Sequence, residues 1–306
     1  MLDYAAARAV ATIVRLGSFD RAARALNVTP SAISQRVRLL EERLGTVLIE
    51  RGSPCTATPS GAWLCRHMEQ VDMLEAGLSR HLPGLSGGDT TAPRVTIELA
   101  VNADSLGTWF LPALARFADR SGFLLNLSVD DEGHTADWLR RGRVLAAVTG
   151  LGQPVQGCDV MALGALRYVP TASPAFMARH FPDGVTATAL AAAPALSFDR
   201  KDLLQQSWAE AQFGPQATGF PCHRLPSTQG FVTACLAGMG WALNPASLVR
   251  DHLAAGRLVP LIADATQDVP LFWQINRMAL QRLQGLTRAV RQAARDALQP
   301  PAGTLA

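Results

Sequence analysis

Hydroxyl, amide and guanidinium side chains share one face of a predicted helix that begins near residue 30. The members of this polar group are Ser31, Ser34, Gln35, Arg36 and Arg38, and Pro30 at the start of the helix is a further candidate for contact with the same partner. Ile33, Val37 and Leu40 recur at helical spacing and predict a buried stripe on the opposite face, which Leu44 would extend. Guanidinium and amide groups can bond base edges, and hydroxyls can bond phosphates. The pattern therefore favours a nucleic-acid-reading helix, although a solvated polar face would look the same.

A shorter amphipathic segment lies immediately before this helix. Phe19, Ala22 and Leu26 fall at helical spacing after Ser18, a residue type that favours the N-cap position. Pro30 then interrupts the periodicity, because proline cannot continue a helix. Two short helices joined by a tight turn, the second carrying the polar face, are typical of a helix-turn-helix that enters the DNA major groove.

A short strand and two turns follow the second helix. Residues 47–51 are predicted to form the strand, and Gly52 and Pro54 mark the turn after it. Thr58 opens another helix. This winged arrangement would place Arg51 at the base of the wing, where it can bond a phosphate. Arg51 and Thr58 therefore join the candidate DNA-binding residues.

Residues 1–83 resemble the N-terminal domain of the LysR-type bacterial transcriptional regulators. The matching residues occur in a fixed order: Ser18–Phe19, Ala22–Ala23, Leu26, Ser31, Ser34, Val37, Leu40–Glu41, Leu44–Gly45, Leu48, Arg51 and Thr58–Gly61. The resemblance implies that the partner is double-stranded promoter DNA. One departure is Thr56, where many members of the family carry arginine or lysine. We therefore expect weaker DNA contact at the wing tip.

Residues 63–82 are predicted to form one long helix with an apolar stripe that includes Leu64, Met68 and Leu74. This stripe must be buried, either against its own winged domain or against the same helix of a second subunit. The resemblance favours the second alternative, a homodimer or homotetramer, in which two recognition helices would read two half-sites. Glycine, serine and proline then dominate residues 83–93, which suggests a hinge.

The composition limits the class of protein. The chain has 306 residues, of which 48% are hydrophobic, enough for more than one core-bearing domain. A net charge of +3 argues against a polycationic DNA coat. Five cysteines are scattered without a paired motif, so we expect reduced thiols in a cytoplasmic protein, with a redox-sensing pair left open. We expect no signal peptide and no membrane-spanning segment.

Beyond residue 94, predicted strands and helices alternate. Strands are predicted at 95–101, 124–129, 145–149, 195–198, 223–225, 241–244, 258–262 and 271–277, and helices at 105–120, 135–141, 174–180, 203–212, 230–238 and 281–298. The chain would cross between two α/β lobes near residues 168–172 and return near 262–269. Small molecules bind in such clefts, at the carboxyl ends of parallel strands.

This half resembles the ArgP/LysG branch of the LysR-type regulators. The matching segments are residues 99–111, 125–132, 139–142, 163–166, 181–186, 221–223 and 244–245. The resemblance implies that the effector is a basic amino acid, lysine or arginine, that basic amino-acid export or metabolism is regulated, and that RNA polymerase is a further partner.

The predicted fold class is α+β. It combines an N-terminal winged helix-turn-helix (1–60), a long linker and dimerisation helix (61–83), a hinge (84–93) and a two-lobed α/β periplasmic-binding-protein-like effector domain (94–306). Lobe I would comprise residues 94–168 and 270–306, and lobe II residues 169–269.

A free basic amino acid presents a carboxylate, an α-ammonium group and a distal cation. Ser105 and Thr149 follow strands of one lobe, and their hydroxyls could hold the carboxylate together with helix amide groups. Because a buried cation needs an acidic partner, carboxylates at strand ends are candidates. These are Asp104, Asp130, Asp131, Glu132, Asp199 and Asp202. Ser227, Thr228 and Gln229 open a helix in the second lobe. Ordinary capping by Asp104 and a solvated turn at 130–132 are the alternatives.

Two other functions compete with this hypothesis. A LysR-type regulator could respond to a different small molecule. An enzyme on a two-lobed fold is disfavoured because the sequence contains no glycine-rich phosphate loop, no G-x-S-x-G motif and no His/Cys metal spacing. It would also leave residues 1–83 without a purpose. We therefore predict no catalytic residues, no cofactor and no metal.

Overall fold

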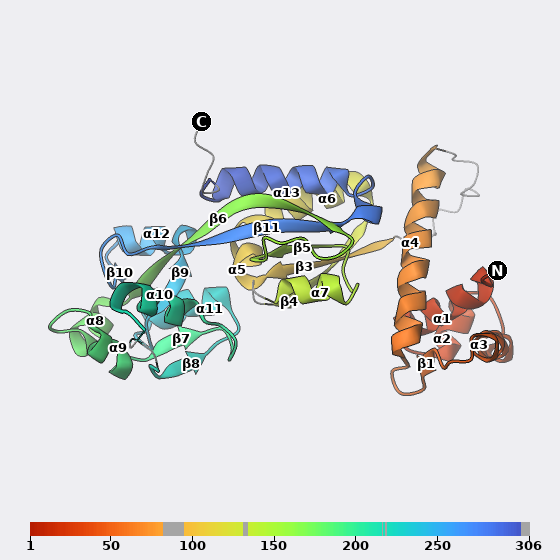
Figure 1. Ribbon diagram of the computed structural model, residues 1–306, viewed down its shortest axis with the longest axis horizontal. Coiled ribbons are helices and arrows are strands. Elements are labelled where there is room, and N and C mark those ends of the chain that lie inside the picture. Colours follow the sequence, from red (N-terminus) through yellow and green to blue (C-terminus); the bar gives the residue numbers. More distant parts are fainter. Residues whose placement is uncertain (82–94, 131–133, 216, 218, 301–306) are drawn as a thin grey trace. The chain divides into compact units, whose positions relative to one another are not determined.

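The structure is a computed structural model that describes residues 1–81, 95–130, 134–215, 217 and 219–300. The chain divides into two compact units, residues 1–95 and 96–306, which are described separately (Figure 1). Among the described residues, no helix combines the length and apolar character needed to cross a bilayer.

The first unit is a winged helix-turn-helix. Its elements are α1 (Tyr4–Leu16), α2 (Phe19–Ala25), α3 (Pro30–Leu44), β1 (Ile49–Glu50), β2 (Thr56–Ala57) and the long α4 (Pro59–His81). Ile13, Ile33 and Val37 form its buried core with small alanines of α1 and α2. The expectation that Leu44 is buried was wrong: it is 46% exposed, because the chain turns away in a left-handed conformation at Gly45.

A mixed sheet in the order β10-β6-β11-β5-β3-β4, with β9 also paired to β6, organises the second unit. Its parallel part contains β3 (Thr96–Asn102), β4 (Leu124–Asp130) and β5 (Ala146–Thr149). The long strands β6 (Cys158–Ala172) and β11 (Gln267–Asn276) pair antiparallel and extend from one lobe into the other (Figure 1). These two strands form the spine of a two-lobed α/β domain, as predicted.

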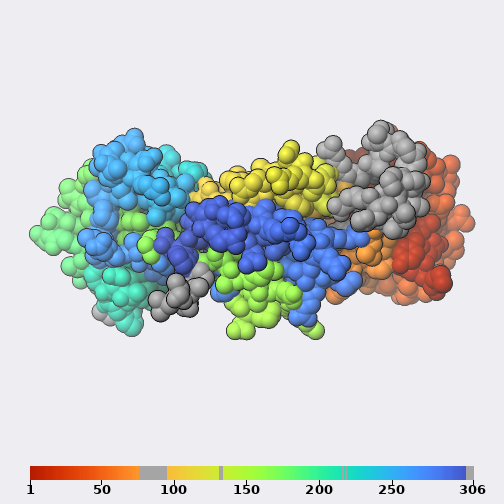
Figure 2. Space-filling view, turned by 90° about the horizontal axis from the view of Figure 1, so that it is seen from above, coloured from red at the N-terminus to blue at the C-terminus, as the bar shows by residue number. Residues whose placement is uncertain are grey.

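Helices cover the sheet of the first lobe. After β3 the chain forms one continuous helical segment, α5 (Ala103–Ser105), a π-helical turn η2 (Leu106–Phe110) and α6 (Leu111–Ser121). The C-terminal α13 (Gln284–Ala297) lies beside α6, and Figure 2 shows the two at the surface in blue and yellow. The remaining elements are α7 (Thr135–Arg140) and the short η3 (Arg277–Ala279).

The second lobe is built on the far ends of the long strands. Its strands are β7 (Ala195–Ser197), β8 (Cys222–Arg224), β9 (Ala242–Pro245) and β10 (Val259–Pro260), and its helices are α8 (Pro174–His180), α9 (Ala187–Ala192), α10 (Leu204–Phe213), α11 (Thr228–Leu236) and α12 (Ala246–Ala254). Trp208 and Trp241 are fully buried in its core. The residue boundaries of domains and lobes stay predictions.

Candidate functional sites

The polar face of α3 is directed outward. Thr29 caps the helix by accepting a hydrogen bond from the Ala32 amide (3.2 Å), and Pro30 occupies the first turn, where proline needs no amide hydrogen. Of the predicted polar residues on this face, Ser34 is half-buried. The exposed ones are Ser31, Gln35, Arg36 and Arg38. The helix therefore presents hydroxyl, amide and guanidinium groups to an outside partner.

Other predicted DNA-binding residues already have contacts within the unit. Arg38 Nε donates to Glu42 Oε1 at 2.7 Å. The Arg51 guanidinium lies over the Phe19 ring, 5.1 Å from its centroid. The Thr58 hydroxyl donates to the Val47 carbonyl oxygen (2.7 Å) and accepts from the Gly61 amide (3.1 Å). Thr58 therefore caps α4 and ties it to the wing.

Two residues of the sequence motif hold the wing in place. Glu41 Oε1 accepts hydrogen bonds from the amides of Leu48 (2.7 Å) and Ile49 (3.3 Å), which joins α3 to the wing strand. A Cβ atom at Gly61 would overlap the Leu48 carbonyl oxygen. Only glycine lets α4 approach the strand this closely.

The apolar stripe of α4 is divided between two environments. Met68 is buried and Leu64 is packed against the core of the winged domain. Leu74, further along the stripe, is 57% exposed, and Trp63, which lies outside the stripe, is 72% exposed. Packing onto its own domain therefore accounts for only part of the stripe.

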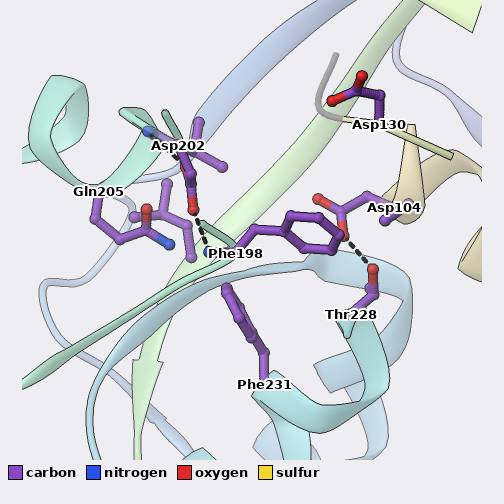
Figure 3. A pocket seen from close by; sticks show the side chains of 10 residues that line it. Asp104, Asp130, Phe198, Asp202, Gln205, Thr228 and Phe231 are labelled. Atoms are coloured by element: carbon purple, nitrogen blue, oxygen red, sulfur yellow. Dashed lines mark hydrogen bonds between the residues drawn. The ribbon is translucent and has the colours of Figure 1, made fainter. Parts of the chain in front are cut away.

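In the second unit, a cavity collects residues from both lobes (Figure 3). It is lined by Ala103, Asp104, Asp130, Phe198, Asp202, Leu204, Gln205, Thr228, Phe231 and Leu243. Asp104 and Asp130 come from the first lobe, where β3 and β4 end. Ala103 precedes Asp104 in α5 of the same lobe, and the other residues come from the segment between β7 and α10 and from α10, α11 and β9 of the second lobe. Figure 3 shows Asp104 and Asp130 on one side of the Phe198 ring and Asp202 and Gln205 on the other.

Asp104 connects three elements. Its Oδ2 accepts a hydrogen bond from the Tyr168 hydroxyl of β6 (2.7 Å), and its Oδ1 accepts one from the Thr228 hydroxyl of α11 (2.5 Å). Its own helix has Asn102, not Asp104, at the N-cap position. The carboxylate thus bridges the two lobes, a role beyond that of a simple helix cap.

The other two cavity acids are also oriented by hydrogen bonds. Asp130 Oδ2 accepts from the indole nitrogen of Trp138 (3.1 Å). Asp202 accepts from the backbone amides of Phe198 (2.8 Å) and Leu204 (3.0 Å). These hydrogen bonds fix the direction in which the two carboxylates point.

The remaining predicted effector residues that the structure describes lie outside the cavity lining. Asp199 accepts hydrogen bonds from the backbone amides of two neighbouring residues, and Ser227 caps α11 through the Gly230 amide (3.0 Å). Thr149 is buried and accepts from the Leu151 amide (3.1 Å). Ser105 is buried, and its hydroxyl has no partner among the described residues. Asp131 and Glu132 lie outside the described residues, and Gln229 is exposed.

Sequence reasoning missed several residues of this cavity. Tyr168 was noted only as a crossing point, and Phe198, Gln205 and Phe231 were not considered. Gln205 stands three positions after a candidate acid at the start of a predicted helix, which is the only sequence signal that could have found it.

Comparison with known proteins identifies the family. Residues 5–62 match the bacterial regulatory helix-turn-helix domain of the lysR family, and residues 91–299 match the LysR substrate binding domain. The chain belongs to the LysR family. This LysR-family chain is 42% identical over 303 residues to the transcriptional regulator ArgP of Aeromonas salmonicida, across 98% of its own length and 99% of that relative.

Solved structures of the same family agree. The crystal structure of ArgP from Mycobacterium tuberculosis matches with a TM-score of 0.81 at 40% identity, covering 98% of this chain and 100% of that one. Full-length LysG from Corynebacterium glutamicum with bound effector Arg matches with a TM-score of 0.71 at 34% identity, with the same coverage. The predicted family, the fold and the class of function, a DNA-binding transcriptional regulator rather than an enzyme, are confirmed.

Proposed function

We propose that this LysR-family regulator reads promoter DNA through α3 and responds to lysine or arginine bound in the cavity between its lobes. The observation that carries the proposal is the charge of the cavity. Of the ten described residues that line it, three are acidic and none is basic. Burying a cation is costly unless it is paired with an acid, so such a cavity suits a ligand with two positive groups. The arginine bound to the related LysG supports the same ligand class.

Each charged group of a basic amino acid would have a partner of opposite charge or suitable polarity at the cavity. Asp104 and Asp130 would take the α-ammonium group, and Asp202 the distal cation. The carboxylate would lie near the start of the helix at Ala103, where backbone amides point outward and the dipole is positive. There, the Ser105 hydroxyl and the Asn102 amide nitrogen are buried without a partner among the described residues, so a ligand carboxylate would accept a hydrogen bond from each.

The switch would act through the relative position of the lobes. The Asp104–Thr228 hydrogen bond joins the two lobes directly. A bound amino acid that pairs with Asp104 would change the contacts of this carboxylate and favour one lobe arrangement over another. The response depends on the difference between the ligand's affinities for the two arrangements. In a homodimer or homotetramer joined through the exposed part of α4, the change would alter the spacing of the paired reading helices.

On the DNA side, Ser31, Ser34, Gln35 and Arg36 would contact base edges or nearby phosphates. Arg38 and Arg51 would bond phosphates of the DNA backbone. Pro30 and Thr58 would lie at the edges of this surface. We place the protein in the cytoplasm, where promoter DNA and RNA polymerase are its further partners.

The test is calorimetric titration of the full-length protein with lysine and arginine. An Asp104→Asn protein should lose effector affinity by at least about 10-fold, because a charged partner of the ligand is removed. It should still bind a DNA fragment from its own upstream region. Asp268→Asn is the matched control, since Asp268 is an exposed acid that pairs with Arg167 outside the cavity. Equal affinity of wild type and the Asp104 variant would refute the assignment.

A further inference from the structure

Gln205 is a buried amide in the cavity wall that has no partner among the described residues. The residue is 3% exposed, and neither Nε2 nor Oε1 makes a hydrogen bond to any described part of the chain. It lies in the first turn of α10, and Figure 3 shows it on the same side of the cavity as Asp202. An unsatisfied buried amide destabilises a fold, so its presence requires an explanation.

Other buried polar side chains without partners differ from Gln205. The amide of Asn102 is likewise unsatisfied, but it stands at the end of β3 in the first lobe, where the ligand carboxylate is proposed to lie. The indole nitrogen of Trp241 is also unsatisfied, but it is a single donor within a cluster of rings that includes Trp208 and Phe220. Gln205 carries both donors and an acceptor, and it lines the cavity. Its unsatisfied groups are therefore available to a molecule that enters this space.

The neighbouring Asp202 defines what such a molecule presents there. Backbone amides hold the Asp202 carboxylate in the cavity wall, so the distal cation of a basic amino acid would pair with it. A guanidinium group has five N–H donors spread over a plane, whereas an ammonium group has three on one nitrogen. Guanidinium can therefore bond Asp202 with one edge and still offer a donor to a second acceptor.

We infer that Gln205 is a specificity-determining residue, whose amide oxygen accepts a hydrogen bond from the guanidinium group of arginine and thereby favours arginine over lysine. The inference rests on the proposed function, because it assumes a basic amino acid in this cavity. It predicts two effects of replacing the amide: a loss of selectivity between the two ligands, and no loss of stability in the ligand-free protein.

The experiment uses the full-length protein and the variants Gln205→Met and Gln205→Ala. Gln206→Met is the matched control, because Gln206 is the next residue of the same helix but lies outside the lining, and its Nε2 bonds Glu210 Oε1 at 2.8 Å. Dissociation constants for arginine and lysine are measured by calorimetry. The melting temperature without ligand is measured by circular dichroism.

In both Gln205 variants, the ratio of the dissociation constant for lysine to that for arginine should fall at least about 5-fold, since a hydrogen bond to a charged group is removed for arginine only. The Gln206 variant should keep the wild-type ratio. The ligand-free Gln205→Met protein should melt at an equal or higher temperature, by up to about 4 °C, because an unsatisfied amide has been replaced by an apolar chain of similar size.

Two results would overturn the inference. An unchanged ratio of affinities in either folded variant would remove Gln205 from ligand recognition. A lower melting temperature in both variants would make Gln205 a structural residue. A wild-type protein that binds neither amino acid would instead contradict the proposed function itself.

Discussion

The reading surface and the effector cavity hold their functional side chains in opposite ways. On α3, exposed side chains project from one helix, and their supports, Glu41 and Gly61, lie close by in sequence. In the cavity, half-buried and buried side chains come from both lobes, and the bond between Asp104 and Thr228 joins residues 124 positions apart. A surface built from one segment can be recognised as a motif, whereas a cavity exists only after the lobes have folded together.

The largest expected effect comes from breaking the local support of the reading surface. In Gly61→Ala the new methyl group would overlap the Leu48 carbonyl oxygen, which belongs to the backbone and cannot move aside. We expect the first unit to lose about 3 kcal/mol or more of unfolding free energy, at the upper end for overpacking. Urea denaturation followed by circular dichroism measures the loss, and arginine binding by the second unit should persist.

Gly45→Ala is the matched control for this substitution. Gly45 has a left-handed conformation, but a Cβ atom there meets open space, so only the backbone strain of about 1–2 kcal/mol is expected. Equal losses in the two variants would show that the close approach at Gly61 is not what holds the wing.

The next effect separates two arginines on the same exposed face. Arg36→Ala should cost about 1–3 kcal/mol of binding to the preferred promoter sequence and relax the choice of base at one position. Arg38→Ala should weaken binding to all sequences alike. It should also reduce the slope of log K against log salt concentration by about the amount expected for one phosphate contact. Fluorescence anisotropy with specific and scrambled DNA at several salt concentrations measures both. The same behaviour in both variants would contradict the division between base and backbone contacts.

The difference between the two regions also explains how far the sequence could be interpreted. The helix-turn-helix was predictable because capping residues and apolar spacing act within single segments; Ser18 does accept the Arg21 amide hydrogen bond (3.4 Å) that its position suggested. Most strands and helices of the second unit were found for the same reason, but α9, α12 and β6 were not predicted. Which residues would face one cavity depended on packing between lobes, which no local pattern records.

One long strand shows where local patterns failed. The sequence analysis placed only residues 168–172 at a crossing and predicted no strand immediately before them, yet β6 begins at Cys158. Gly164 in its middle is a residue type that normally weakens a strand. Here glycine is required, because a Cβ atom would overlap the carbonyl oxygen of Gln299 in the C-terminal segment that bridges to Ala165. Glycine at position 164 is thus required by a contact with a distant part of the chain, although within its own segment it argued against a continuous strand.

A smaller effect tests whether Glu41 supports the wing through its charge. Glu41→Gln keeps one acceptor oxygen but loses the charged hydrogen bonds to Leu48 and Ile49, so we expect a loss of about 1–2 kcal/mol in unfolding free energy. Glu42→Gln is the control, since the exposed Glu42 carboxylate pairs with the exposed Arg38 one turn back on the same helix and does not bond the wing amides that Glu41 holds. Chemical denaturation compares them, and equal midpoints would mean that the wing does not depend on this carboxylate.

The smallest effect on function is expected from the cysteines, and it tests the redox-sensing pair that the sequence left open. Burial raises the pKa of the Cys235 thiol to about 12 and, with a contribution from Glu69, that of Cys65 to about 11. Since the thiolate is the reactive form, native Cys65 should react with iodoacetamide at pH 8 about 100-fold more slowly than in the urea-unfolded chain, and Cys235 more slowly still.

The sign of the pH dependence follows from the same shifts. Because folding disfavours both thiolates, the stability that comes from keeping the thiols protonated is complete below pH 9 and is lost as the pH rises toward 11 and 12. Mass spectrometry of alkylated peptides at several pH values measures each site separately. If Cys235 in the native protein were alkylated as fast as in the urea-unfolded chain, the second lobe would open readily. The side chains of its core would then be as accessible to reagents as the exposed side chains of α3.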